Sequence, residues 1–182
     1  MTTLLPPDLR LRCACRTRPF HIILVQPEIP PNTGNIARLC AATGCALHLV
    51  TPLGFRIDEH AVRRAGLDYW PLVELHVHPS LREAEEAVQS LCLADHNRCS
   101  ASWLFSGRAA RSVFDQRLDI GDALVFGRES VGLDEGLLAS RVENVLAIPT
   151  AGPVRSLNLA NSVAIAAYEG LRQNDLTRVV SS

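Results

Sequence analysis

Short, almost wholly apolar runs recur along the chain, and turn-forming residues end each of them. Residues 20–26, 46–50 and 123–126 are such runs, and they are typical of strands that are buried on both faces. Segments with helical periodicity lie between them, and Gly44 stops the first of these helices. Strands that alternate with helices favour an α/β domain with a mostly parallel, Rossmann-like sheet.

The order of these elements predicts where a ligand would bind. We expect strands at 20–26, 46–50, 72–77, 101–105, 123–126 and 145–148, and helices at 32–43, 58–65, 81–91 and 157–173. Ligands of doubly wound sheets lie beyond the carboxyl ends of the strands. The loop at Asn32, the turn at Gly127 and the loop 149–156 all follow strands, so we expect them to converge on one site.

Two of the helices have recognisable starts. Asn32 can cap the first helix, and Ser156 can cap the last. We expect apolar residues of the last helix to form a buried stripe, namely Leu157, Ala160, Ala164, Ala167 and Leu171. The alanines of this stripe are also small enough for a second helix to approach closely.

The length of the chain bounds its domain organisation. With 182 residues, 47% of them apolar, it can form one well-packed domain but not two ordinary ones. We expect that domain at residues 20–182, after a flexible extension at residues 1–19. No apolar run approaches the length of a membrane span, and the start lacks a secretory signal, so we expect no membrane association and a cytoplasmic protein.

The charge of the chain does not by itself indicate nucleic-acid binding. The net charge is −1, and the first twenty residues carry four arginines and one acid (+3), which leaves −4 for the rest. All 18 fixed cations are arginines, which hold phosphate bidentately, although a GC-rich coding bias gives the same composition. A bound tRNA would need a local positive surface, assembled across two subunits if necessary.

The cysteines and histidines form no recognisable metal motif. The six cysteines lack the C-x-x-C spacing of zinc sites, and Cys40 and Cys45 fit reduced core thiols. His76 and His78 share one face of an expected strand, but no third ligand lies near them in the sequence. We therefore expect no metal.

Three motifs carry the chemistry. The first, at residues 30–38, reads P-P-N-T-G-N-I-A-R. A helix cap explains Asn32 but not Arg38, which lies beside Asn35 on the helix surface. Free N–H groups at a helix start and a nearby arginine form a natural phosphate site. Arg38 is therefore a candidate functional residue.

The other two motifs follow strands. Residues 127–132 read G-R-E-S-V-G, and glycine supplies the positive φ that such turns need. Gly127 would also let a flat ligand approach the backbone, while Glu129 would either orient Arg38 or tie down the turn. The third motif runs from Ile148-Pro149 to Ser156-Leu157-Asn158, at the start of the last helix.

In this order the three motifs resemble those of the SPOUT methyltransferases, over about residues 20–173. The resemblance is closest to the branch that methylates the ribose 2′-hydroxyl of the tRNA wobble nucleotide, as the segments 28–35 and 63–69 indicate. It implies a C-terminal trefoil knot, S-adenosylmethionine as cofactor and S-adenosylhomocysteine as product. It also implies tRNA as substrate, with cytidine or carboxymethylaminomethyl-uridine as the base, and a homodimer in which RNA on one subunit meets the cofactor of the other.

The resemblance also implies roles for individual residues. Asn32 and Arg38 match residues that hold RNA and activate the attacking hydroxyl, and we expect Glu129 to support this catalytic site. Ser156 and Asn158 match residues of the catalytic site. The cofactor would contact the knot largely through main-chain groups, at Gly127, Gly132, Ile148, Ser156 and, on a looser alignment, Trp103. Trp103 departs from the small polar residue expected at that position.

Several alternatives stay open. Arginine is a poor proton acceptor, because its pKa lies above about 12. Arg38 would be the base only if its surroundings depressed that pKa strongly; otherwise it stabilises the alkoxide while a phosphate or water takes the proton. Methylation of another tRNA or rRNA position is the runner-up function, and a non-catalytic RNA-binding module is the rival from a different class. A nicotinamide-dependent oxidoreductase is disfavoured, because residues 27–32 lack the G-x-G-x-x-G turn.

Overall fold

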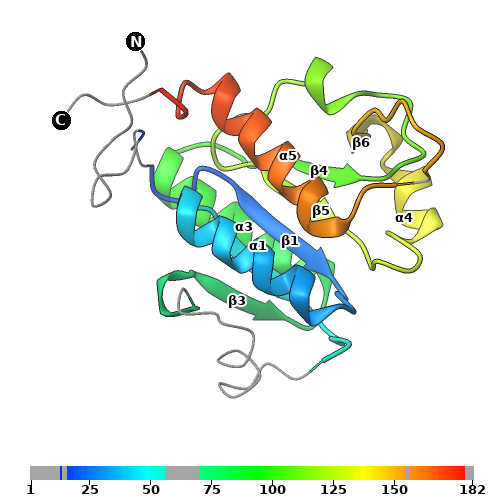
Figure 1. Ribbon diagram of the computed structural model, residues 1–182. Coiled ribbons are helices and arrows are strands. Elements are labelled where there is room, and N and C mark those ends of the chain that lie inside the picture. The colour runs from blue at the N-terminus through cyan, green and yellow to red at the C-terminus, as the bar shows by residue number, and fades with distance from the viewer. Residues whose placement is uncertain (1–12, 14–15, 56–69, 155, 179–182) are drawn as a thin grey trace, which may run out of the picture.

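The computed structural model describes residues 13, 16–55, 70–154 and 156–178 (Figure 1). The strands are β1 (His21–Val25), β2 (Ala46–Val50), β3 (Leu75–His78), β4 (Ser102–Phe105), β5 (Ala123–Phe126) and β6 (Val145–Leu146). The α-helices are α1 (Pro30–Thr43), α3 (Leu81–His96), α4 (Glu135–Ser140) and α5 (Leu159–Gln173). Short 3-10 turns lie at Trp70–Leu72, Val113–Asp115 and Val142–Asn144.

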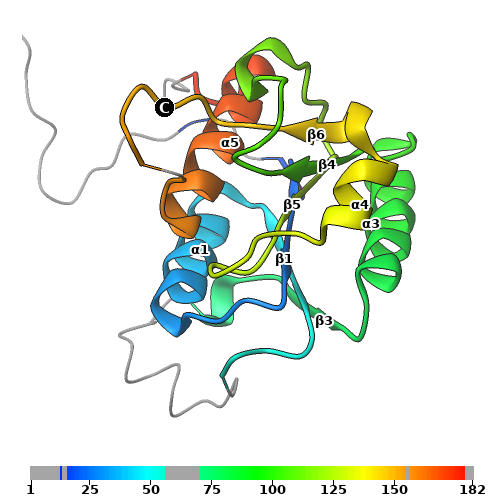
Figure 2. The same ribbon diagram turned by 90° about the vertical axis from the view of Figure 1, so that its right-hand side faces the viewer.

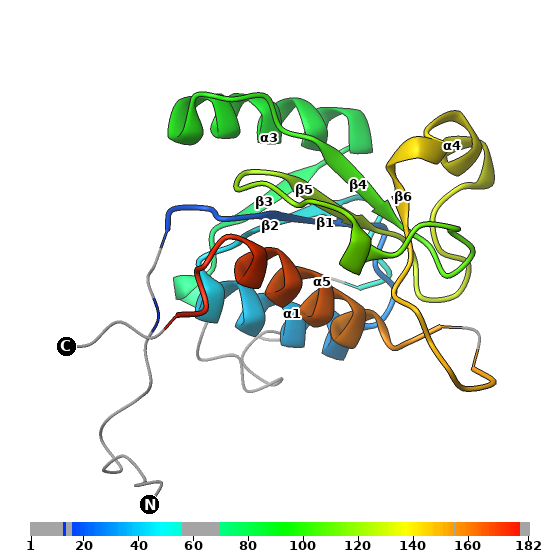
Figure 3. The ribbon, with the colours of Figure 1, turned by 90° about the horizontal axis from the view of Figure 1, so that it is seen from above.

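The strands form one six-stranded sheet in the order β3-β2-β1-β5-β4-β6, and every neighbouring pair is parallel. Helices α1 and α5 lie side by side on one face of the sheet, and α3 covers the other face (Figure 3). The view in Figure 2 shows α4 on the same side as α3. The predicted parallel α/β fold is therefore confirmed, whereas the knot implied by the resemblance stays a prediction.

Alternate residues of the strands fill two hydrophobic cores. The core under α1 and α5 includes Ile22, Leu24, Leu47, Leu49 and Leu124, all buried. The core under α3 includes Ile23, Val50, Val125, Ala84 and Val88. Because both faces of the central strands are buried, their sequences read as continuous apolar runs.

Both predicted helix caps need correction. Helix α1 begins at Pro30, and Ile29 stands at the N-cap without a side-chain hydrogen bond. The prolines supply the fixed φ of the first helical positions and lack N–H groups that would need a cap. Asn32 therefore lies inside the first turn. Helix α5 is capped by Asn158 rather than Ser156, because the Asn158 side chain accepts from the N–H groups of Ala160 and Asn161.

The buried stripe of α5 is shifted from the expected one. Ala167 and Leu171 are buried as predicted, together with Val163 and Ala166. The other three predicted residues, Leu157, Ala160 and Ala164, are only partly buried. Since Ala167 faces the core of its own chain, it is not available to contact a second helix.

Other differences lie at the ends of elements. Helix α3 runs to His96, beyond the predicted end at residue 91, and β3 begins only at Leu75. The helix predicted at 58–65 lies outside the described residues. Arg18 forms ion pairs with Glu74 (2.6 Å) and Asp95 (2.5 Å), so contacts with the domain begin before residue 20. Among the described helices, none has the length and apolar character needed to span a membrane.

Candidate active site

A cavity of about 870 Å³ opens at the carboxyl edge of the sheet, where β5, β4 and β6 end side by side. Residues that follow each of these strands line it, together with the start of α5 and the residues around the start of α1. Its lining includes Ile29, Asn32, Phe105, Ser106, Gly107, Phe126, Gly127, Glu129, Gly132, Ile148, Ser156 and Asn158. The predicted convergence of the three motifs is thus present.

The turn at residues 127–132, named the cofactor turn after the contact that the sequence predicts, closes on itself. The main chains of Arg128 and Gly132 exchange two hydrogen bonds, of 3.3 and 2.8 Å. A Cβ atom on Gly127 would lie 2.1 Å from the carbonyl carbon of Gly132 and 2.2 Å from the nitrogen of Leu133. We expected Gly127 to make room for a ligand; instead, that space is filled by the turn's own backbone. Glycine is required there for the turn to form.

Glu129 anchors the cofactor turn to the start of α1. Its carboxylate accepts hydrogen bonds from the backbone N–H groups of Glu28 (2.8 Å) and Ile29 (3.3 Å) and from the side-chain amide of Asn32 (3.0 Å). A carboxylate is favoured at this position because the helix N-terminus carries partial positive charge. Of the two roles expected for Glu129, the structure shows the second, tying down the turn.

Asn32 extends this network to α5. Its side-chain oxygen accepts from the amide of Asn158 at 2.9 Å, while the oxygen of Asn158 caps α5. Each group of the two amides thus has a defined partner, which fixes their orientation. Three segments far apart in the sequence therefore meet through Glu129, Asn32 and Asn158.

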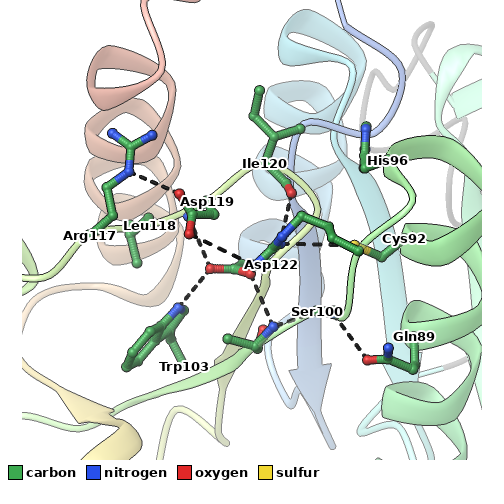
Figure 4. A network of polar contacts seen from close by, with 12 residues as sticks. Gln89, Cys92, His96, Ser100, Trp103, Arg117, Leu118, Asp119, Ile120 and Asp122 are labelled. Carbon is green, nitrogen blue, oxygen red and sulfur yellow. Dashed lines mark hydrogen bonds and ion pairs between the residues drawn. The ribbon is translucent and has the colours of Figure 1, made fainter.

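Most predicted site residues line the cavity. Arg38 and Trp103 are the exceptions. Arg38 lies on the exposed side of α1, outside the lining of this cavity. Trp103 lies on β4, with its indole directed to a polar network near the start of β5 (Figure 4).

That network explains the position of Trp103. Its indole N–H donates to the buried carboxylate of Asp122 at 2.9 Å. Asp122 also accepts from the Arg98 guanidinium and from the backbone N–H groups of Ala101 and Asp119. Trp103 is not among the residues that line the cavity, and its predicted main-chain contact with the cofactor stays a prediction. Phe105, Ser106 and Gly107 line the cavity instead, and the rule that ligands lie at carboxyl strand ends would have identified them.

The histidines of β3 do have a third partner, contrary to the expectation from sequence. Nδ1 of His48 lies 3.0 Å from Nε2 of His78, and the His48 ring stacks on His76 with centroids 4.7 Å apart. Nε2 of His48 lies 3.0 Å from Nδ1 of His21. No group of three or more metal-binding side chains in the described part of the chain has the arrangement of a metal site.

The sequence profile of the SpoU rRNA Methylase family matches residues 19–168. The chain belongs to this family. Among its relatives, the tRNA (cytidine(34)-2′-O)-methyltransferase of Polaromonas sp. is 46% identical over 158 residues, covering 85% of this chain and 91% of the relative. The enzyme of the same name from Acidovorax sp. is 45% identical over 156 residues, with coverages of 85% and 92%.

Solved structures agree with this assignment. A protein described in connection with 2-OH methylation of C/U34 on tRNA has a TM-score of 0.75 and 47% identity, covering 85% of this chain and 95% of that one. The methyltransferase AviRb from Streptomyces viridochromogenes, in complex with AdoMet, has a TM-score of 0.72 and covers 93% of this chain and 63% of its own. Its identity of 24% shows a shared fold.

Proposed function

We propose that this protein binds S-adenosylmethionine in the cavity and transfers its methyl group to the ribose 2′-hydroxyl of the wobble nucleotide of tRNA. The observation that carries the proposal is the joining of the cofactor turn, Asn32 and Asn158 at one cavity, in a chain 46% identical to a tRNA (cytidine(34)-2′-O)-methyltransferase. The proposal includes a cytoplasmic location, since tRNA is the substrate.

The walls of the cavity fit such a cofactor. Its volume of about 870 Å³ lies within the range of sites for cofactors and drug-sized ligands. Phe105 and Phe126 stack with ring centroids 4.5 Å apart and offer an apolar surface for a flat base. Gly107, Gly127 and Ile148, which follow the strands, also line the cavity. We expect their main-chain groups to pair with the polar edge of the base.

The protein's own contribution to the reaction is positioning and charge stabilisation. S-adenosylmethionine supplies a methyl group already activated on a sulfonium, so the residues must align the ribose hydroxyl and stabilise the charge that forms as its proton leaves. Ser156 and Asn158 line the cavity just before α5, which supports a role for them in binding ligand groups. Arg38 stabilises the developing alkoxide or the adjacent phosphate, and its fixed fork suits both anions.

We further propose that the active enzyme is a homodimer that pairs near α5. Arg38 does not line the cavity of its own chain, although it lies on the helix whose first turn does. Pairing would let Arg38 of one subunit serve the cavity of the other. A molar mass in light scattering that corresponds to the monomer, at micromolar concentration, would contradict this part of the proposal.

Two experiments test the function. Calorimetric titration of the purified protein with S-adenosylmethionine, without added metal, is expected to show binding, and its absence at millimolar ligand would overturn the methyltransferase assignment. Mapping of 2′-O-methyl groups in tRNA from a deletion strain is expected to show loss at position 34. Loss at another position would instead support the runner-up substrate.

A further inference from the structure

Two carboxylates link the start of α1 and the cofactor turn in opposite directions. Glu129 reaches from the turn to the residues before α1, as described above. Glu28 reaches the other way: its carboxylate accepts from the backbone N–H of Ser130 at 2.9 Å and from the Ser130 hydroxyl at 2.9 Å. No motif in the sequence singled out Glu28 or Ser130 for a role of its own.

The backbone of Glu28 is itself held in place. The carbonyl oxygen of Pro27 accepts from the N–H of Gly54 at 3.0 Å. A Cβ atom on Gly54 would lie 2.8 Å from the Cα of Glu28, so only glycine allows this approach. Gln26, two residues earlier, has a φ of 53°, in the left-handed region that non-glycine residues rarely adopt. Strain of this kind persists where surrounding structure fixes the backbone. The backbone from which the Glu28 side chain extends is therefore fixed in position.

The cofactor turn depends on contacts from outside. Its own main-chain bonds join Arg128 and Gly132 at the base of the turn, and Ser130 and Val131 at the tip are exposed to solvent. Glu28 holds the tip, and Glu129 ties the turn to α1. Hydrogen bonds from Ser130 lower the pKa of Glu28, so its carboxylate is charged at neutral pH. Charged acceptors make the stronger hydrogen bonds.

We propose that Glu28 is a positioning residue for methyl transfer, which acts through Ser130 to hold the cofactor turn ready for S-adenosylmethionine. The inference rests on the proposed function of this cavity. Ordering a loop upon binding costs free energy, and a turn that is already ordered avoids that cost. Loss of the Glu28 carboxylate should therefore weaken cofactor binding without removing a direct ligand contact.

The test compares cofactor affinity and turn mobility in the full-length protein. In Glu28→Ala we expect the calorimetric Kd for S-adenosylmethionine to rise about tenfold, as for loss of charge-assisted hydrogen bonds. Amide exchange at residues 128–132 in the ligand-free protein should quicken by a similar factor. Glu28→Gln should stay within about threefold of wild type, because its amide can still accept from the Ser130 N–H and donate to the hydroxyl.

Ser130→Ala provides a second route to the same contact, and Glu86→Ala on α3 is the matched control for loss of an exposed glutamate. The double variant Glu28→Ala/Ser130→Ala should bind the cofactor no more weakly than Glu28→Ala, because both changes remove one interaction. A lowered melting temperature with unchanged Kd and unchanged exchange would overturn the inference. So would a higher KM for tRNA alone. If the wild-type protein binds no cofactor, the proposed function itself fails, which is a separate outcome.

Discussion

Arg38 lies on the exposed side of α1, six residues after Asn32, and its side chain belongs to neither hydrophobic core. We predict that Arg38→Ala leaves the free energy of unfolding nearly unchanged. Its methylation rate should fall about a hundredfold or more, as for loss of a single donor to a developing anion. Cofactor affinity should stay within a few-fold of wild type. Single-turnover rates with saturating tRNA and cofactor measure the effect.

Arg38→Lys serves as the control for charge. Lysine keeps the positive charge but loses the planar fork, so we expect a rate between those of wild type and Arg38→Ala. A near-normal rate in Arg38→Ala would remove this residue from the catalytic machinery.

Gly127 offers a second test at the scale of one residue. In Gly127→Ala the new Cβ would lie 2.1 Å from the backbone of Gly132, so the cofactor turn cannot close. We predict loss of measurable cofactor binding by calorimetry, with a folded domain by circular dichroism. Gly152→Ala is the control, because a Cβ there meets nothing within 4 Å. Normal affinity in Gly127→Ala would show that the closed turn is not needed.

Individual residues differed in how far sequence could predict them. Gly127 and Glu129 stood out because a strand that breaks into a glycine-bounded turn is unusual. Glu28 did not, because an acid after a strand is ordinary and its partner Ser130 lies 102 residues away. The surroundings of the Trp103 indole were not predictable, because the buried carboxylate of Asp122, which accepts from its N–H, is not visible as a partner in the sequence.

At the scale of elements, Asn158 joins two functions at the start of α5. It caps the helix and also donates to Asn32. We predict that Asn158→Ala lowers the free energy of unfolding by about 1 kcal/mol through loss of the cap. Asn158→Asp should keep the cap, because a carboxylate still accepts from the helix N–H groups. It should lose the donor to Asn32.

If the link to Asn32 matters for the reaction, both variants should methylate tRNA about tenfold more slowly, the usual effect of losing one such hydrogen bond. Only the alanine variant should be less stable in chemical denaturation. A normal rate in Asn158→Asp would show that the link is structural only.

The histidines between the sheet and α3 predict a pH-dependent stability. Burial, with nearby positive charge, lowers the pKa of His21 to about 4 and that of His48 to about 2. Below the unfolded value near 6.5, the unfolded chain binds protons that the folded chain does not, so stability falls as pH decreases. We expect a loss of roughly 1–3 kcal/mol between pH 6.5 and 5, from denaturant unfolding curves.

Other charged groups face this cluster, namely Arg18, Glu74, His76, His78, Glu83 and Asp95. Because the ordinary pKa values of carboxylates lie near 4, these groups contribute little to the change of stability between pH 6.5 and 5. Burial lowers the pKa of His78 as well, so three histidines contribute to the slope. His21→Phe should lower the slope with pH by roughly a third, because one of these three groups is lost. An equal slope in this variant would place the dependence elsewhere.

Helices and strands were predictable from sequence where burial alone determines their position. The strands β1, β2 and β5 are buried on both faces, so their apolar runs marked them within a residue or two. The cap of α1 was not, because the Asn32 side chain pairs with Glu129 and Asn158 on other segments. The cap of α5 was not, because Ser156 and Asn158 are both residue types that suit a cap. A local rule cannot choose between them.

On the scale of the whole molecule, Arg38 and the cavity are separate within one chain, although the proposed reaction needs both. The small residues of α5 could not settle this arrangement from sequence, because one of them, Ala167, is buried in the chain's own core. Substitutions at Arg38 and Gly127 therefore cause two independent defects. We expect the first to affect the reaction with RNA and the second to affect cofactor binding.

A mixture of the two variants distinguishes an active site built from two subunits from one built from a single chain. If Arg38 of one subunit completes the cavity of its partner, a heterodimer of Arg38→Ala and Gly127→Ala contains one intact site and one doubly defective site. Random re-pairing of equal amounts makes half of the dimers mixed, so about a quarter of all sites are restored under twofold symmetry. We predict that methylation activity recovers to about this fraction after co-refolding, although each variant alone is inactive. If every site were built from one chain, each would keep its own defect, and the mixture would stay inactive.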